Sequence, residues 1–381
     1  MKYIPRKAES LVATYLNDFS VVGVTGPRQS GKSTMLNHLL GGTYRYVTFD
    51  DYHTTERFNT DPVKFMEEFS NKVVFDEVQI VPEIFRHIKY AVDRDRKRYG
   101  KFVLTGSSQF AFLKGVSESL AGRIGLLTLL PFEYSEIPNG QKKKSVALGC
   151  YPERVEKKYV RSANWFSSYL DTYLTRDIRA LSNIGDIRDF RRCISLLAAR
   201  AGQILNMSDL SRDIGVTVAT IKKWISVLEA SYIVFLLPPY YKNLGKRIIK
   251  SPKVYFYDMG LVSYLLGIEN LSMLEQHPHY GNLFENYVIA EIAKKEIHRN
   301  THSELFYYRT NHGVEIDLLI DRRSSVEYVE VKSANKFQPD MIRGISTLLR
   351  EKEKATVLYQ GKSFSYSNNI EVKYFGDYLM R

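Results

Sequence analysis

Residues 26–33 have the types and spacing of a loop that binds the phosphates of a nucleotide. They read G-P-R-Q-S-G-K-S and fit the pattern G-x-x-x-x-G-K-[ST] completely. Glycines let the backbone curve around a phosphate, and N–H groups at the start of the following helix favour the anion. We expect Lys32 to reach the β- and γ-phosphates and the Ser33 hydroxyl to coordinate Mg²⁺. The predicted nucleotide-binding residues are Gly26, Pro27, Arg28, Gln29, Ser30, Gly31, Lys32, Ser33 and Thr34.

Two adjacent carboxylates, Asp76 and Glu77, end the apolar run K-V-V-F-D-E. In P-loop ATPases an Asp at a strand end holds Mg²⁺, and a neighbouring group orients the attacking water. We therefore assign Asp76 to the metal and Glu77 to catalysis, together with Lys32. The alternative is that the acidic pair only caps the next helix.

Other candidates follow further along the same region. The run FVLTGSS ends in Thr105, Ser107 and Ser108, whose hydroxyls would face the nucleotide and sense its γ-phosphate, unless they only shape a turn. Arg123, in SLAGR, is a candidate catalytic cation, acting in its own chain or on another. From spacing alone, a surface arginine is an equal alternative.

The C-terminal third carries a pattern that suits metal chemistry. Asp317 lies inside the apolar run 314–320, and Glu330 and Lys332 end the run 326–332. Residues two apart share one face of a strand, and Asp317 joins that face if the two strands pair. A carboxylate buried in an apolar strand is costly unless its charge is compensated. Mg²⁺ or Mn²⁺ would compensate it and activate a water.

The elements that must position these residues differ along the chain. Between residues 21 and 125 four strand candidates, VVGVTG, YRYVTFD, KVVFDEV and KFVLTGS, alternate with helical segments. That alternation predicts a parallel sheet covered by helices on both faces. The basic stretch NGQKKKS indicates a boundary. Helical periodicity dominates residues 160–250, and strands mix with helices again from about Lys253.

Residues 208–229, SDLSRDIGVTVATIKKWISVLE, follow the helix-turn-helix pattern. The turn falls at Gly215, Thr217 is the expected N-cap, and Lys222 and Lys223 are expected on the exposed face. YIVFLLPPY and KRIIKSPKVYF are candidates for a wing. The region either contacts DNA through its lysines or packs as a structural module without DNA.

Charge and composition narrow the class. The net charge is +12, and residues 141–250 alone hold 20 Lys/Arg against 9 Asp/Glu. Such an excess suits a nucleic-acid-binding module, although a solvated basic surface explains it equally. Two cysteines are too few for a disulfide framework, and no apolar run reaches the ~20 residues of a membrane helix. We expect a cytoplasmic protein with no membrane partner.

Taken together, GPRQSGKST, VVFDEVQ, LTGSSQF and SESLAGR resemble the AAA+-type P-loop ATPases of bacteria and archaea. In that group a winged-helix region follows the ATPase module, and then a C-terminal domain similar to PD-(D/E)XK nucleases. YLDTYLTRDI, KRIIKSPKVYFYDMGL and GVEIDLLI extend the resemblance over nearly the whole chain. It implies ATP and Mg²⁺ as cofactors.

The resemblance also implies roles in the C-terminal third. Asp317 and Glu330 would be ligands of a second Mg²⁺ or Mn²⁺, and Lys332 would position or activate the water. Glu285, in GNLFENYVIAEIA, would supply a further carboxylate, with Glu291 as its competitor. The alternative is an inactive nuclease fold kept as an interaction domain, with its charges paired internally.

We therefore predict an α/β chain with three domains. Residues 1–140 form the ATPase domain, 141–255 a helical linker and winged helix, and 256–381 a restriction-endonuclease-like domain. The predicted function is that of a Mg²⁺-dependent ATPase that acts on or with DNA. The alternative is an ATP-dependent switch or scaffold that binds a protein partner or another copy of itself.

Overall fold

The computed structural model describes residues 3–106, 109–174, 186–240, 251–310, 313–349 and 353–381. It divides into two compact units. The first comprises residues 1–131 with 297–300, and the second comprises 132–296 with 301–381. The basic stretch that the sequence marked as a boundary is helical and belongs to the second unit, as part of α7 (Asn139–Leu148). The three-domain division stays a prediction.

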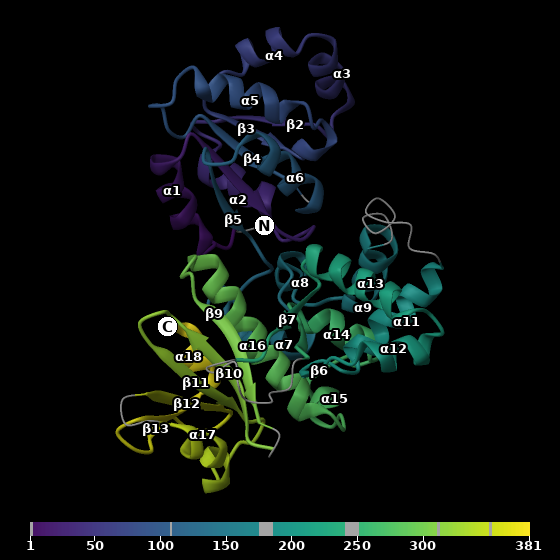
Figure 1. Cartoon of the computed structure of the whole chain (residues 1–381), viewed down its shortest axis with the longest axis vertical. Helices are drawn as coiled ribbons and strands as arrows, with labels where there is room; N and C mark the ends of the chain where they lie inside the picture. The colour runs from purple at the N-terminus through teal and green to yellow at the C-terminus, as the bar shows by residue number, and fades with distance from the viewer. Residues whose placement is uncertain (1–2, 107–108, 175–185, 241–250, 311–312, 350–352) are drawn as a thin grey trace. The chain divides into compact units, whose positions relative to one another are not determined.

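A parallel five-stranded sheet forms the centre of the first unit, as the sequence predicted (Figure 1). Its strand order is β2-β3-β4-β1-β5, so the strand that precedes the phosphate loop is an inner one. The strands are β1 (Val21–Thr25), β2 (Arg45–Thr48), β3 (Val73–Asp76), β4 (Phe102–Thr105) and β5 (Ile124–Thr128).

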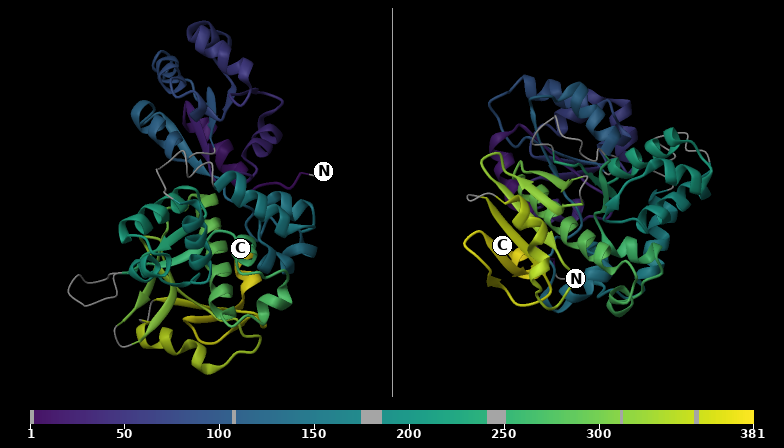
Figure 2. Two further views of the ribbon diagram at one scale, coloured as in Figure 1. Left: turned by 90° about the vertical axis from the view of Figure 1, so that its right-hand side faces the viewer. Right: turned by 60° about the horizontal axis from the view of Figure 1, so that its bottom comes forward.

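Helices cover both faces of this sheet (Figure 2). Side chains alternate along the strands: Val73 and Phe75 pack on one face, and Val74 packs on the other. Burial of both faces explains why the strands read as continuous apolar runs. The helices are α1 (Ala8–Asp18), α2 (Lys32–Leu40), α3 (Tyr52–Thr60), α4 (Pro62–Glu68), the 3₁₀ turn η1 (Val78–Ile80), α5 (Ile84–Asp93) and α6 (Gln109–Ser119).

The second unit begins with helices and contains the predicted pair at residues 208–229. Gly215 ends α12 (Met207–Ile214) with φ 88°, and the Thr217 side chain caps α13 (Val218–Ala230), as predicted. A three-stranded sheet of order β6-β8-β7 combines a strand before this helix pair with two strands after it. In chain order the elements are α7, α8 (Pro152–Glu156), α9 (Ser162–Tyr169), the π-helical turn η2 (Leu170–Leu174), α11 (Ile187–Ala198), β6 (Gln203–Ile204), α12, α13, β7 (Val234–Leu237), β8 (Lys253–Phe256), α14 (Met259–Leu265) and α15 (Leu271–Glu275).

A mixed six-stranded sheet completes the second unit, with order β13-β14-β12-β11-β10-β9. Strands β9, β10 and β11 are antiparallel neighbours, whereas β11, β12 and β14 run parallel. The elements are α16 (Tyr280–Arg299), β9 (Glu304–Arg309), β10 (Glu315–Asp321), β11 (Val326–Val331), the 3₁₀ turn η3 (Pro339–Ile342), α17 (Arg343–Leu348), β12 (Lys354–Tyr359), β13 (Phe364–Ser365), β14 (Ile370–Tyr374) and α18 (Phe375–Met380).

Candidate functional site

The phosphate-loop sequence connects β1 to α2 and depends on its glycines. Gly26 and Gly31 have φ angles of 140° and 91°, which side-chain-bearing residues rarely adopt. A Cβ on Gly26 would lie 2.1 Å from the backbone oxygen of Leu129. The loop therefore keeps its backbone close to β5, as a phosphate cradle requires.

Lys32 is 6% exposed, and its ammonium lies over the loop. Its Nζ donates to the backbone oxygens of Gly26 and Pro27 at 3.0 and 2.9 Å. This buried cation is therefore positioned where the loop would receive phosphate oxygens.

Ser33 and Asp76, the predicted magnesium pair, lie together at the carboxyl end of β3. The Ser33 Oγ donates to Asp76 Oδ2 at 3.0 Å. Tyr46, which the sequence analysis did not single out as a site residue, donates from its hydroxyl to the same oxygen at 2.5 Å. Burial, and next the Asp76 carboxylate, raise the pKa of Tyr46, so the phenol remains a proton donor at neutral pH.

Four buried hydroxyl and carboxylate oxygens at this edge of the sheet have no hydrogen-bond partner within the part of the chain that the structure describes. They are Thr25 Oγ1, Ser30 Oγ, Asp76 Oδ1 and Thr105 Oγ1. Buried polar atoms are rarely left unsatisfied, so such a cluster indicates a missing ligand. Carboxylate and hydroxyl oxygens suit hydrated Mg²⁺, and hydroxyl groups also donate to phosphate. The residues present therefore fit a Mg²⁺-nucleotide.

Glu77 follows Asp76 with a left-handed φ of 57° and accepts a hydrogen bond from Gln79 Nε2. Gln79, in η1, is a residue that the sequence analysis did not assign. A Cβ on Gly106 would lie only 2.4 Å from Gln79 Oε1, so this side chain packs at the end of β4. The sequence signal that could have identified Gln79 is that it is the one polar residue in the otherwise apolar turn V-Q-I.

Arg123 does not lie near the phosphate loop of its own chain. It directly precedes β5, at the amino end of the parallel sheet, whereas the loop follows the carboxyl end of β1. Its Nε and Nη2 bind the two Asp93 oxygens at 2.8 and 3.1 Å. The Arg123 guanidinium lowers the pKa of Asp93. A role in the same chain's site is therefore not supported by this geometry, and a role on another chain stays a prediction. Ser107 and Ser108 lie outside the described residues.

Arg6 supports the loop from α1's amino side and was missed by the sequence analysis. It is 5% exposed and donates from Nη1 to Ser30 O and from Nη2 to Leu130 O, both at 2.7 Å. These partners are 24 and 124 residues away, so no local pattern could have revealed them.

In the second unit, the structure brings together the predicted acidic residues. Register places Asp317 on β10 opposite Glu330 on β11, and Asp317 Oδ2 accepts from Val331 N at 2.8 Å. Lys332 Nζ lies 2.5 Å from Glu330 Oε1. Glu285 on α16 belongs to the same cluster, because one lysine ammonium, that of Lys253, contacts both Glu285 and Asp317. Glu291 instead pairs with Lys294 and accepts from Tyr134 N at 2.6 Å.

A second lysine, Lys253 on β8, lies among these carboxylates and was not predicted. It is 3% exposed. Its Nζ lies 3.0 Å from Glu285 Oε1, 2.6 Å from Glu315 Oε1 and 4.0 Å from Asp317 Oδ1. The Tyr255 hydroxyl also donates to Glu285 Oε1, at 2.6 Å. A lysine in the apolar strand K-V-Y-F was a signal of the same kind as Asp317, and the sequence analysis assigned it only to a wing.

The pKa values show how this cluster shares charge. Burial, and next the Asp317 carboxylate, raise the pKa of Glu285 to about 7 and of Glu330 to about 8. Burial alone would lower the pKa of Lys253, but Glu285, Asp317 and Glu315 raise it above its ordinary value. Lys253 is therefore a permanent internal cation. Among the described residues, no group of three or more acidic, His or Cys side chains has an arrangement that could hold a metal ion.

Comparisons with known proteins agree with the first site. Residues 18–138 match the family described as an AAA domain. Residues 140–272 and 280–376 match two domains of unknown function, DUF8612 and DUF4143.

The curated relatives and solved structures give the extent of similarity. An uncharacterised protein of Mycobacterium tuberculosis is 29% identical over 94% of this chain and 80% of its own length, and one of Haemophilus influenzae is 22% identical over 94% of each chain. A Walker-type ATPase of Pyrococcus abyssi has 14% identity and a TM-score of 0.46, covering 70% of this chain and 99% of that one. A point variant of RuvB from Thermotoga maritima has 14% identity and a TM-score of 0.31, covering 61% and 89%.

The described helices were also compared with the requirements of a membrane span. None of them combines the length and the apolar character needed to cross a bilayer.

Arg6→Ala should weaken ATP binding and lower the free energy of unfolding by about 1–3 kcal/mol, because two buried carbonyls lose a charged donor. The matched control is Lys97→Ala, which removes an exposed cation of the same unit. Calorimetric ATP titration and denaturant unfolding measure the two effects. Equal ATP affinity in Arg6→Ala and in the control would contradict a role of Arg6 in shaping the loop.

Proposed function

We propose that the chain is a Mg²⁺-dependent ATPase. The observation that carries this proposal is the set of four unsatisfied buried oxygens, among the described residues, beside Lys32 and the Ser33–Asp76 pair. Lys32 would contact the β- and γ-phosphates, and Ser33 and Asp76 would hold hydrated Mg²⁺. Bound Mg²⁺ would offset the charge of the phosphates. Glu77, oriented by Gln79, would accept a proton from the attacking water.

Lys32→Ala should weaken ATP binding at least about tenfold, because the phosphates lose a charge-assisted contact. Glu77→Gln should keep ATP affinity and slow phosphate release by about 10²-fold or more, because the amide cannot accept the proton. ATP titration measures the affinity of each variant, and phosphate release measures its turnover rate, with Lys97→Ala as the control. Parent rates in Glu77→Gln would assign the base to another residue, and unchanged affinity in Lys32→Ala would reject the ATP site.

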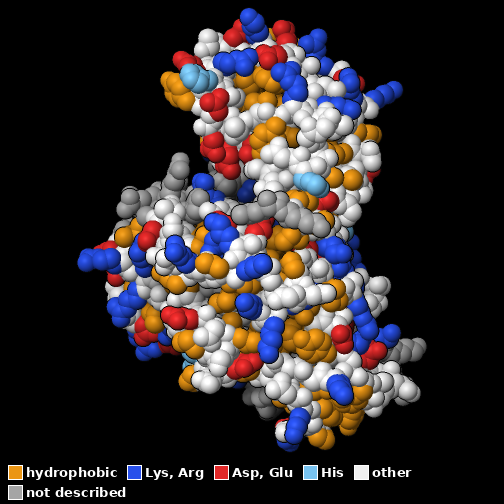
Figure 3. Space-filling model, turned by 180° about the vertical axis from the view of Figure 1, so that it is seen from behind, with side chains coloured by type: hydrophobic (Ala, Val, Ile, Leu, Met, Phe, Trp, Pro, Cys, Tyr) orange, Lys and Arg blue, Asp and Glu red, His pale blue; other side chains and the backbone are white. Residues whose placement is uncertain are grey.

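The proposed place of action is on or with DNA, through the helix pair at residues 207–230. Its recognition helix α13 exposes Lys222 and Lys223, while Ile221 and Trp224 are buried. On the face shown in Figure 3, Lys and Arg side chains are scattered over the second unit, with fewer Asp and Glu among them. Such a surface supports sequence-independent contact with phosphates.

Replacing both Lys222 and Lys223 by Ala should weaken binding to every DNA sequence alike and reduce the salt dependence of affinity. Fluorescence anisotropy with duplex and single-stranded DNA at several salt concentrations measures this. The control changes the exposed Lys97 and Lys64 of the first unit. Absence of DNA binding at low salt would leave the alternative function, an ATP-dependent switch that binds a protein partner or another copy of the chain. In an assembly of copies, Arg123 would act on the nucleotide site of the neighbouring copy.

Two proposals concern the carboxylate cluster of the second unit. In one, Glu285, Asp317 and Glu330 bind a second Mg²⁺ or Mn²⁺, and Lys332 positions a water for nucleic-acid cleavage. Glu330 Oε2, which is buried and has no hydrogen-bond partner within the described ranges, supports it. In the other, the domain is inactive and its charges are neutralised internally. The contacts of Lys253 with Glu285 and Glu315 favour the second proposal.

Lys253→Met should decide between these proposals. Without the Lys253 ammonium, Glu285 loses its ion-pair partner, and the free energy of unfolding should fall by about 3–5 kcal/mol. Mn²⁺ should restore part of this stability by taking the lysine's place. Thermal unfolding with and without Mn²⁺ is compared for parent, Lys253→Met and the exposed control Lys336→Met, all carrying Lys32→Ala.

Internal neutralisation predicts a Mn²⁺-dependent shift only in Lys253→Met. A shift in the parent that Asp317→Ala removes, with cleavage of nucleic acid that Asp317→Ala, Glu330→Ala and Lys332→Ala each abolish, would establish the nuclease instead.

A further inference from the structure

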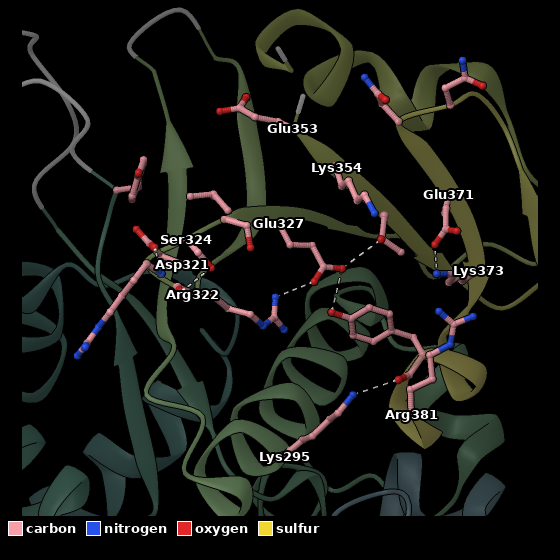
Figure 4. A pocket seen from close by; sticks show the side chains of 18 residues that line it. Lys295, Asp321, Arg322, Ser324, Glu327, Glu353, Lys354, Glu371, Lys373 and Arg381 are labelled. Atoms are coloured by element: carbon pink, nitrogen blue, oxygen red, sulfur yellow. Dashed lines mark hydrogen bonds and ion pairs between the residues drawn. The ribbon is translucent and has the colours of Figure 1, made fainter. Parts of the chain in front are cut away.

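A second concave site lies in the six-stranded sheet of the second unit, away from the carboxylate cluster (Figure 4). It is a cavity of about 850 Å³ at the amino-terminal ends of the parallel strands β11, β12 and β14. Glu330 and Lys332 lie at the opposite, carboxyl-terminal end of β11. The two sites are therefore separated along the strands, and no residue of the phosphate loop lines this cavity.

The floor of the cavity is held rigidly by Glu327 on β11. Its Oε1 accepts hydrogen bonds from Thr356 Oγ1 at 3.2 Å and from the Tyr378 hydroxyl at 3.1 Å. Its Oε2 pairs with Arg322 Nη1 at 3.0 Å, and Arg322 Nη2 reaches Glu296 Oε1 at 3.2 Å. Both oxygens of Glu327 are therefore satisfied from within the fold, and Arg322 already balances two carboxylates.

The walls carry an excess of positive charge. Six Lys or Arg residues line the cavity against four Asp or Glu residues. Lys373 on β14 is 8% exposed and pairs with Glu371. Burial, and next the Arg381 guanidinium, lower the pKa of Lys373, and Lys354 adds to the effect. Lys354 on β12, Lys373 on β14 and Arg381 after α18 all line this cavity, as Figure 4 shows.

We propose that this cavity binds a phosphate-bearing ligand, with its phosphate between Lys354, Lys373 and Arg381. Lys354 and Lys373 lie on the neighbouring strands β12 and β14, and Arg381 follows α18. Like charges near one another repel, and an anion between them reduces that cost. The volume falls within the range of about 300–1,000 Å³ that small-molecule sites occupy.

The rest of the lining suits the polar part of a nucleotide. Its rim carries the hydroxyls of Ser324 and Ser325 and the amides of Asn368 and Asn369. Hydroxyl and amide groups both donate and accept hydrogen bonds, as the sugar and base edges require. The phosphate comes either from a free nucleotide or from a nucleic-acid strand, and both present the same chemistry to the three cations.

The test uses the full chain with Lys32→Ala, so that binding at the phosphate loop does not contribute to the measured signal. Calorimetry measures binding of three probes: inorganic phosphate, adenosine monophosphate and a 5′-phosphorylated single-stranded octanucleotide. The variant is Lys354→Glu, which reverses an exposed charge on the rim and leaves the floor intact. Lys336→Glu is the matched control, because Lys336 is an exposed lysine of the same unit outside the cavity lining.

At least one probe should bind saturably, and Lys354→Glu should weaken it at least about tenfold, the effect of losing a charge-assisted phosphate contact. Lys336→Glu should bind like the parent. Lys373→Met provides a second variant with the same expected loss. Comparable affinities for the mononucleotide and the octanucleotide identify a free nucleotide, and preference for the octanucleotide identifies a strand. No saturable binding of any probe, or equal affinity in parent and Lys354→Glu, would overturn the proposal, and neither result depends on ATP turnover.

Discussion

The cost of burying a carboxylate in an apolar sheet determines how the sites of this protein are built. Asp76 ends β3 and Asp317 lies inside β10, both in strands whose other residues are mostly buried and apolar. A buried charge is tolerated only with hydrogen-bond donors or a compensating cation. The two units compensate the buried charge of Asp76 and of Asp317 in different ways.

At Asp76 the protein supplies donors to one carboxylate oxygen and leaves the other without a partner among the described residues. Ser33 and Tyr46 both bind Oδ2, while Oδ1 is buried and unsatisfied. At Asp317 the protein supplies its own cations, because Lys253 and Lys332 lie within the acidic cluster. An incomplete set of partners favours binding of an external cation. In the Asp317 cluster the internal lysines favour a structural role, while Glu330 Oε2 is the one oxygen of Glu285, Asp317 and Glu330 found unsatisfied within the described residues.

The sequence predicted the parts of these sites that depend on local pattern. The Gly26 and Gly31 spacing, the strand ending at Asp76 and the Thr217 cap need only neighbouring residues, and the structure shows each of them. Period-two alternation also predicted that Asp317 joins the face of Glu330 and Lys332 if the two strands pair, and the strands are antiparallel neighbours. The conformation of the loop at residues 26–31 therefore follows from local pattern, and its binding of phosphate stays a prediction.

Residues that act across long sequence separations were not foreseen. Arg6 reaches Leu130, and Lys253 on β8 reaches a carboxylate of β10, because the tertiary fold brings these elements together. Arg123 shows a limit of local reasoning: its motif suggested a catalytic cation, and strand direction places it at the amino end of its own sheet, so only a role on another chain stays a prediction. Sequence spacing does not specify which end of a sheet a loop residue reaches until the strand order is known.

The carboxyl ends of the neighbouring strands β3 and β4 are connected through the side chains of Glu77 and Gln79. Its left-handed backbone turns the chain directly after Asp76, and Gln79 then binds the Glu77 carboxylate. The same Gln79 side chain packs so close to Gly106, after β4, that a Cβ there would overlap it. A shift of the β4 end would therefore move Gln79 and, through it, the Glu77 carboxylate. Thr105 Oγ1, at the end of β4, is one of the unsatisfied oxygens of the described residues, so the positions of this hydroxyl and of the Glu77 carboxylate are physically linked.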